Sequence, residues 1–236
     1  MSELNVNMQR QVSVYVNGFN LYYGLFRGPG CCPPESKWLN IVTLAESICE
    51  SKGVEASITS VRYCTAKALP TDSDPGQPIR QLRMLTALGT LPEVQLIYGQ
   101  HKERPTKVKL YGPNRKVQSP TVLVSKREEK GSDVNLAAFL VRDAALNVFD
   151  FAIVITDDSD LHQAVRIAVD DFEREVWVAS PFCRRKEDTK ELSNVASHYF
   201  RLDPAMAALC QFPDDILNGE GEAIVSRPFE WRSQQL

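Results

Sequence analysis

Short apolar runs alternate along this chain with segments whose apolar residues recur at helical spacing. The clearest run is FAIVIT at 151–156, and VSVYV at 12–16 is a second. Between them, Ile41, Leu44 and Ile48 follow the three- and four-residue spacing of one helix face. Parallel strands need helical crossovers, so this alternation predicts a sheet buried between two layers of helices. We therefore expect an α/β, Rossmann-like fold with a central, mostly parallel sheet and helices on both faces.

The remaining elements follow from the same two patterns. Strands are predicted at 56–63, 94–99, 122–124 and 176–179, and helices at 79–88, 134–146, 159–169 and 192–200. Asp133 stands at the expected N-cap of the helix that begins VNLAAF. We expect residues 1–203 to form one domain with a basic hairpin insert at about 100–120. The tail, 204–236, is rich in turn residues but carries aromatic side chains, and is expected to pack on that domain.

Composition argues against several classes of protein. No apolar run approaches the roughly 20 residues that a transmembrane helix needs. The N-terminal stretch MSELNVNMQRQ lacks the apolar core of a signal peptide. The six cysteines form no C-x-x-C pair. These features predict a cytoplasmic protein with reduced thiols and no membrane association.

Charge is distributed unevenly along the chain. The net charge is −3, yet from Lys102 to Lys130 nine Lys or Arg residues face three Glu, a local balance of +6 that leaves −9 elsewhere. A basic segment in an acidic protein indicates an anionic partner. The alternative is an ordinary solvated hairpin face.

Carboxylates follow the strongest predicted strand. Asp157, Asp158 and Asp160 come directly after FAIVIT. Oxygen ligands at a strand end suit a hard cation such as Mg²⁺ or Mn²⁺, although an Asp/Ser cluster can also simply cap the following helix. Ligands collect at the carboxyl edge of such sheets, so we expect Asp133, Asp158, Asp160 and the turn at Asn17 to meet there.

Three segments carry a family resemblance. VYVNGFNLYYG at 14–24, REEKGSDVNLAAFLVRDA at 127–144 and VITDDSDLHQAV at 154–165 resemble the signature blocks of NYN domains, a branch of the PIN-like nuclease superfamily. GEAIVSRPFEW at 221–231 is similar to the tail of bacterial stand-alone members. The order and separation of the blocks also fit, and the resemblance runs over nearly the whole chain.

This resemblance implies a PIN-like fold and metal-dependent cleavage of RNA by acidic residues. Carried over residue by residue, it implies that Asp133, Asp158 and Asp160 are catalytic and bind Mg²⁺ or Mn²⁺. The first family aspartate falls on Asn17, whose amide can coordinate a cation but supplies no charge. Catalysis is therefore expected to be weakened or lost. Asn20 matches the polar residue that often closes the first turn.

The basic segment supplies the expected contacts to RNA, because cations there attract phosphates without reading sequence. The expected nucleic-acid contacts are Asn20, Lys107, Lys109, Arg115, Lys116, Lys126, Arg127 and Lys130. The aromatic residues Phe19, Tyr22, Tyr23 and Phe26 suit either base stacking or ordinary core packing.

The function expected from these features is a metal-dependent ribonuclease of the NYN type that hydrolyses RNA phosphodiester bonds. Two alternatives stay open. One is a non-cleaving RNA-binding regulator, which Asn17 favours, and the other is a Rossmann-like Mg²⁺-dependent phosphatase. The sequence also leaves open a homo-oligomer or an inhibitory partner protein.

Overall fold

The structure is a computed structural model that describes residues 9–27, 31–109, 121–182 and 189–233. The helices, including short 3₁₀ and π turns, and the strands alternate over most of this length. The strands are β1 (Arg10–Asn17), β2 (Ala56–Thr65), β3 (Val94–Tyr98), β4 (Gln100–Lys109), β5 (Thr121–Lys130), β6 (Phe151–Ile155), β7 (Glu175–Ser180), β8 (His198–Arg201), β9 (Asp215–Leu217) and β10 (Ala223–Ser226). The helices are α1 (Gly18–Phe26), η1 (Pro34–Lys37), α2 (Ile41–Ser51), α3 (Gln77–Leu88), α4 (Ser132–Ala145), η2 (Ser159–Leu161), α5 (His162–Arg166), η3 (Ile167–Asp171), α6 (Lys190–Ser193), α7 (Pro204–Leu209) and η4 (Phe229–Trp231).

A six-stranded sheet forms the centre of the molecule, in the order β3-β2-β1-β6-β7-β8. Every neighbouring pair in it is parallel. The expected α/β fold with a parallel sheet and helices on both faces is therefore confirmed. The chain builds outward from β1 in one direction and then from β6 in the other, so the strand order reverses between β1 and β6. In sheets of this kind, ligands bind outside the carboxyl ends of the strands at such a reversal.

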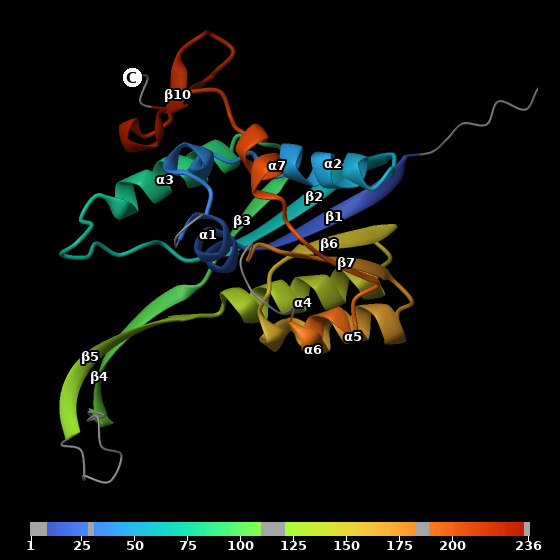
Figure 1. The fold of residues 1–236 in the computed structure, drawn as a ribbon, viewed down its shortest axis with the longest axis horizontal. Coiled ribbons are helices and arrows are strands. Elements are labelled where there is room, and N and C mark those ends of the chain that lie inside the picture. The colour runs from blue at the N-terminus through green and yellow to red at the C-terminus, as the bar shows by residue number, and fades with distance from the viewer. Residues whose placement is uncertain (1–8, 28–30, 110–120, 183–188, 234–236) are drawn as a thin grey trace, which may run out of the picture.

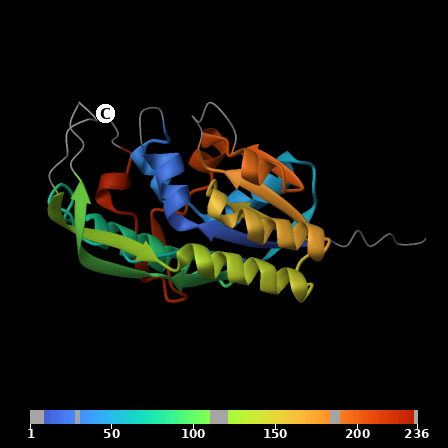
Figure 2. The ribbon, with the colours of Figure 1, turned by 90° about the horizontal axis from the view of Figure 1, so that it is seen from below.

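Two hydrophobic cores lie on the two faces of the sheet (Figure 1). Alternate residues of β1 point to opposite faces, so that Val14 enters one core and Tyr15 the other. The core that contains Val14 is covered by α1, α2, α3 and α7, and the other by α4, α5 and α6. In Figure 2 the α4 and α5 helices lie side by side across their face of the sheet.

The C-terminal segment packs on the first of these cores. Trp38 is fully buried there, with its ring centroid 5.9 Å from Phe212 and 6.4 Å from Trp231. The Trp38 indole Nε1 donates a hydrogen bond of 2.8 Å to the Pro213 carbonyl. Burial of a large apolar side chain contributes about 1.5–3 kcal/mol, so these rings hold the segment against the sheet layer.

β4 and β5 form an antiparallel ribbon that extends from the body of the molecule (Figure 1). Neither hydrophobic core contains a residue of this ribbon. The hairpin was predicted at about 100–120, whereas β4 pairs along its whole length with β5, which lies beyond that range and includes the short strand predicted at 122–124. Residues 110–120, including Arg115 and Lys116, lie outside the described residues.

Two local predictions were wrong. Asp133 lies inside the first turn of α4 rather than at its N-cap, because Gly131, with φ 101°, makes the left-handed turn into the helix. The helix predicted at 192–200 ends at Ser193, and β8 follows because it completes the sheet beside β7. The helix predicted at 159–169 is present as one continuous helical stretch, made of η2, α5 and the π turn η3.

Candidate functional site

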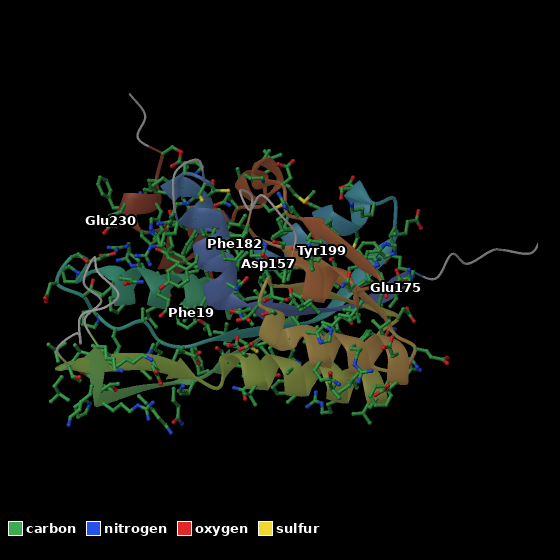
Figure 3. The ribbon with its side chains drawn as sticks, turned by 60° about the horizontal axis from the view of Figure 1, so that its bottom comes forward. Phe19, Asp157, Glu175, Phe182, Tyr199 and Glu230 are labelled. Atoms are coloured by element: carbon green, nitrogen blue, oxygen red, sulfur yellow. The ribbon has the colours of Figure 1, made fainter. Side chains whose placement is uncertain are left out.

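The carboxyl edge of the sheet at the β1/β6 reversal gathers the polar residues singled out by sequence. Asn17 ends β1, and Thr156 to Asp158 follow β6, its parallel neighbour. In Figure 3, Asp157 lies between Phe19 and Tyr199, and Glu175, at the start of β7, lies farther from Phe19 than Asp157 does. The topology thus places the predicted residues at the edge where α/β sheets bind ligands.

Asn17 is buried and uses both atoms of its amide. Its Oδ1 accepts a hydrogen bond of 3.0 Å from the Asn20 backbone N–H, which caps α1. Its Nδ2 donates a hydrogen bond of 2.7 Å to Asp133 Oδ1. The predicted proximity of Asn17 and Asp133 is therefore present as a direct contact. An amide suits this position because one atom must accept while the other donates.

Asn20 and Asp157 fix the loop after β6. The Asn20 side chain accepts a hydrogen bond of 2.7 Å from the Asp157 backbone N–H. The buried Asp157 carboxylate accepts from the Tyr199 hydroxyl at 2.7 Å and from Thr189 Oγ1 at 2.6 Å. These contacts position the loop, and they direct Asn20 toward the β6 loop rather than toward solvent.

Asp158 and Asp160 begin the turn that follows. Asp158 Oδ1 accepts a hydrogen bond of 3.0 Å from the Asp160 backbone N–H and caps η2. The capping alternative is therefore correct for Asp158. Asp160 is exposed.

The charges of this cluster act on Asp133. Burial raises the pKa of the half-buried Asp133 carboxyl above its usual range, and the charges of Asp158, Glu129 and Asp160 add to the rise. The hydrogen bond from Asn17 opposes this effect. The four predicted residues are therefore close enough to interact electrostatically, and we call Asn17, Asp133, Asp158 and Asp160 the acidic cluster.

The acidic cluster has donors of the right kind for a hard cation but does not present them as a metal site. Among the described residues, no three His, Cys, Asp or Glu side chains converge on a point that could hold an ion. One oxygen of Asp133 accepts from Asn17, and one oxygen of Asp158 is used in capping. Binding of Mg²⁺ or Mn²⁺ here stays a prediction, and it would require these side chains to turn.

The basic residues of the ribbon do not form one surface. Lys126 and Lys130 both pair with Glu128, and their hydrogen bonds lower the pKa of Glu128 to about 2. The pairing register places Lys107 and Lys109 on the opposite face from these lysines. Arg127 lies on β5 opposite Glu103. Contacts between RNA and these residues stay predictions.

A second feature of the same edge is an aromatic pocket on the other side of α1. It has a volume of about 110 Å³. Its aromatic and apolar walls come from α1, the start of α2 and the residues before it, β2, α3 and the C-terminal segment. They include Phe19, Leu21, Tyr22, Tyr23, Phe26, Leu39, Ile41, Tyr63, Met84, Leu85 and Trp231. Gly18 allows the tight junction between α1 and β2, because a Cβ there would lie 2.8 Å from Tyr63 Cε1.

The pocket also contains polar groups. Lys37, Asp74, Gln77, Arg80 and Gln81 contribute to its wall. Burial raises the pKa of the Tyr63 hydroxyl, which keeps this group protonated and able to donate a hydrogen bond. A mostly aromatic lining with a few polar groups is typical of sites for small organic molecules.

Only part of this pocket was predictable from the sequence. The four aromatic residues of α1 were considered for stacking or for the core, and the structure places all of them in the pocket wall. Lys37, Arg80 and Trp231 were missed. They lie far apart in sequence, and the one signal present was the aromatic character of the tail.

The helices in the described part of the chain are all too short or too polar to cross a membrane. No family model matches the chain. A protein of unknown function from Vibrio parahaemolyticus, known from its crystal structure, is 14% identical, with 83% of this chain and 94% of that chain covered. Its TM-score of 0.45 is too low to carry an argument.

One curated protein gives a clearer similarity. The chain is 27% identical over 242 residues to 6-hydroxy-3-succinoylpyridine 3-monooxygenase HspA of Pseudomonas putida. The match covers 94% of this chain and 75% of that protein. The relative is named as an enzyme, in agreement with the expectation of an enzyme, but its reaction is an oxygenation.

This similarity corrects the predicted function. A metal-dependent ribonuclease, and with it the description as a nuclease or hydrolase, is contradicted by a relative that is named a monooxygenase and matches nearly the full chain. The two alternatives drawn from the same residues are set aside with it. The interpretation gave too much weight to the carboxylates, which here cap a turn and accept the Asn17 amide. Membership of the NYN family stays a prediction.

Proposed function

We propose that this protein is an oxidoreductase of the monooxygenase type that hydroxylates a small aromatic ring bound in the aromatic pocket. The observation that carries the proposal is the 27% identity to a pyridine-ring monooxygenase over 94% of the chain. Similarity at this level does not transfer the substrate, so the substrate class is inferred from the pocket.

The size and lining of the pocket favour a single ring. Its volume of about 110 Å³ is comparable with the roughly 150 Å³ of an apolar cavity that takes up benzene. Tyr22 and Phe26 have ring centroids 6.1 Å apart, and Tyr23 stacks on Phe19 with an interplanar angle of 17°. A planar heterocycle would gain dispersion and edge-to-face contacts with such walls.

The proposed reaction replaces a ring C–H bond by C–OH. One atom of dioxygen enters the product and the other leaves as water, and a two-electron donor such as a reduced nicotinamide supplies the electrons. The pocket residues bind and orient the ring. The neutral Tyr63 hydroxyl can donate a hydrogen bond to a ring nitrogen or carbonyl, and Trp231 helps to exclude water from that side.

The pocket does not fit a flavin. Its volume suits one six-membered ring rather than the three fused rings of an isoalloxazine. The first strand is followed by NGFNLYYG and not by the G-x-G-x-x-G fingerprint of dinucleotide-binding turns. We therefore assign the pocket to the substrate and derive no step through a flavin.

Oxygen-dependent turnover tests the proposal directly. The purified protein is incubated with hydroxypyridines, reduced nicotinamide and ¹⁸O₂, with and without added FAD, and products are analysed by mass spectrometry. We expect one ¹⁸O atom in the hydroxylated ring. Tyr22→Ala should lose most activity, whereas Tyr22→Phe, which keeps the ring, should retain it. Absence of a labelled product under every donor condition would contradict the proposal.

A further inference from the structure

The charged groups of the aromatic pocket differ in whether they are already neutralised. Arg80 is paired twice: Nη2 lies 2.6 Å from Asp74 Oδ2, and Nη1 lies 3.2 Å from Glu230 Oε1. Two carboxylates therefore offset its single positive charge. Arg80 joins the loop before α3 to the C-terminal segment, and its charge is not available to a ligand.

Lys37 is the second cation of the pocket wall, and unlike Arg80 it is not paired with a carboxylate among the described residues. Its Nζ lies 3.5 Å from the Tyr22 hydroxyl and 5.3 Å from the centroid of that ring. Within the described residues, Lys37 makes no ion pair with a carboxylate. A half-buried ammonium group beside aromatic rings thus keeps most of its capacity to bind an anion.

The backbone holds Lys37 in place without its side chain. Lys37 ends η1, and the next residue, Trp38, is fully buried and bonded to the Pro213 carbonyl. The Gln211 side chain also donates a hydrogen bond of 3.0 Å to the Ser36 carbonyl. The ammonium group is therefore presented to the pocket from a fixed turn, which lowers the entropic cost of binding.

We propose that Lys37 makes the pocket selective for aromatic ligands that carry a carboxylate, with the ring against Tyr22 and the carboxylate on Lys37 Nζ. The inference rests on the proposed function for the location of the substrate. Arg80 has a different role, since it forms part of the pocket wall and holds the C-terminal segment through Glu230. The ligand class is thus a six-membered heteroaromatic acid, and its uncharged amide should bind more weakly.

A matched pair of ligands tests this assignment. Calorimetric titration compares pyridine-3-carboxylate with pyridine-3-carboxamide, which has the same ring and nearly the same shape but no charge. The wild-type protein should prefer the carboxylate by roughly tenfold or more, the effect of one charged hydrogen bond. Lys37→Met should remove this preference by weakening carboxylate binding far more than amide binding, and Lys37→Arg should keep it.

Lys52 provides the control. Its Nζ lies 4.7 Å from the Phe200 ring, so it is also a lysine over an aromatic ring, but it is not part of the pocket. Lys52→Met should leave the preference intact. Equal weakening of both ligands by Lys37→Met, or equal effects at Lys37 and Lys52, would overturn the proposed selectivity. If the preference for the carboxylate depends on Lys37 but no oxygenated product forms, the proposed selectivity is upheld and only the monooxygenase reaction is rejected. Failure of the wild type to bind either ligand would reject Lys37 selectivity together with the pocket.

Discussion

Asn17 joins the first helix to the start of α4 through a single amide. Replacement by Asp keeps the capping oxygen but places a second carboxylate at the 2.7 Å contact with Asp133. We expect Asn17→Asp to destabilise the protein by about 1–3 kcal/mol at neutral pH, because a donor is lost and like charges are brought together.

Thermal unfolding with Mg²⁺, with Mn²⁺ and with EDTA measures this change. If the acidic cluster can hold a cation, either ion should restore the melting temperature of Asn17→Asp far more than that of Asn17→Ser, which keeps a capping oxygen without adding charge. Equal responses of the two variants to the ions would contradict the predicted metal binding.

Asp133 should contribute to stability in a pH-dependent way. Its pKa is raised in the folded state, so ionisation at neutral pH costs folding free energy that is recovered as the pH falls through the raised pKa. Asp133→Asn keeps an acceptor for Asn17 and removes the charge. We expect its melting temperature to exceed that of the wild type by roughly 1–3 °C at pH 7.

The difference should shrink on acidification, and parallel melting curves from pH 7 to pH 4 provide the measurement. The Asp143→Asn variant serves as a contrast, since buried Asp143 accepts hydrogen bonds from Tyr15 and Arg142 and its loss should destabilise. A gain for Asp133→Asn that stays constant over this range would show that its charge is not the cause.

At the residue scale, the sequence predicts which side chains lie close together better than it predicts the interactions that they make. Asn17, Asp133, Asp158 and Asp160 were placed together correctly because parallel strands share a carboxyl edge. Their hydrogen bonds were not predictable, since they depend on side-chain directions set by tertiary packing. The wrong functional interpretation arose at that step.

At the scale of elements, η4 contains one buried and one exposed aromatic side chain, which can be compared directly. Trp231 is 7% exposed and packs on Trp38, whereas Phe229 is 82% exposed. Trp231→Ala should cost about 3–5 kcal/mol and lower the melting temperature by on the order of 10 °C. Phe229→Ala should change stability by less than about 0.5 kcal/mol. Calorimetry of both variants checks this, and similar losses would mean that the segment is not held by Trp231.

The elements that sequence predicted best are the buried ones. FAIVIT and VSVYV became β6 and β1 because each is covered on both faces, so that the apolar pattern alone determines them. Residues 192–200 were misassigned because Leu192 and Val195 have helical spacing, while the following residues pair with β7 through tertiary contacts. The length of the β4–β5 ribbon could not be predicted, because its strands are mostly exposed and lack an apolar pattern.

At the scale of the whole molecule, the ribbon is separable from the body. No residue of β4 or β5 belongs to either core, and the two strands contact mainly each other. A variant in which residues 104–126 are replaced by a short turn should therefore unfold within about 3 °C of the wild type. Calorimetry and ligand titration together test this, and a loss of several kcal/mol would show that the ribbon supports the sheet.

The nine-residue helix α1 lies between the acidic cluster and the aromatic pocket. The amide of its N-cap residue, Asn17, contacts Asp133, and its aromatic side chains line the pocket. A bound ring that shifted α1 would therefore also change the Asn17–Asp133 contact and the proton affinity of Asp133, a thermodynamic linkage between the two sites. The linkage is reciprocal: by whatever factor a bound ring changes the proton affinity of Asp133, a proton on Asp133 changes the affinity for the ring by the same factor.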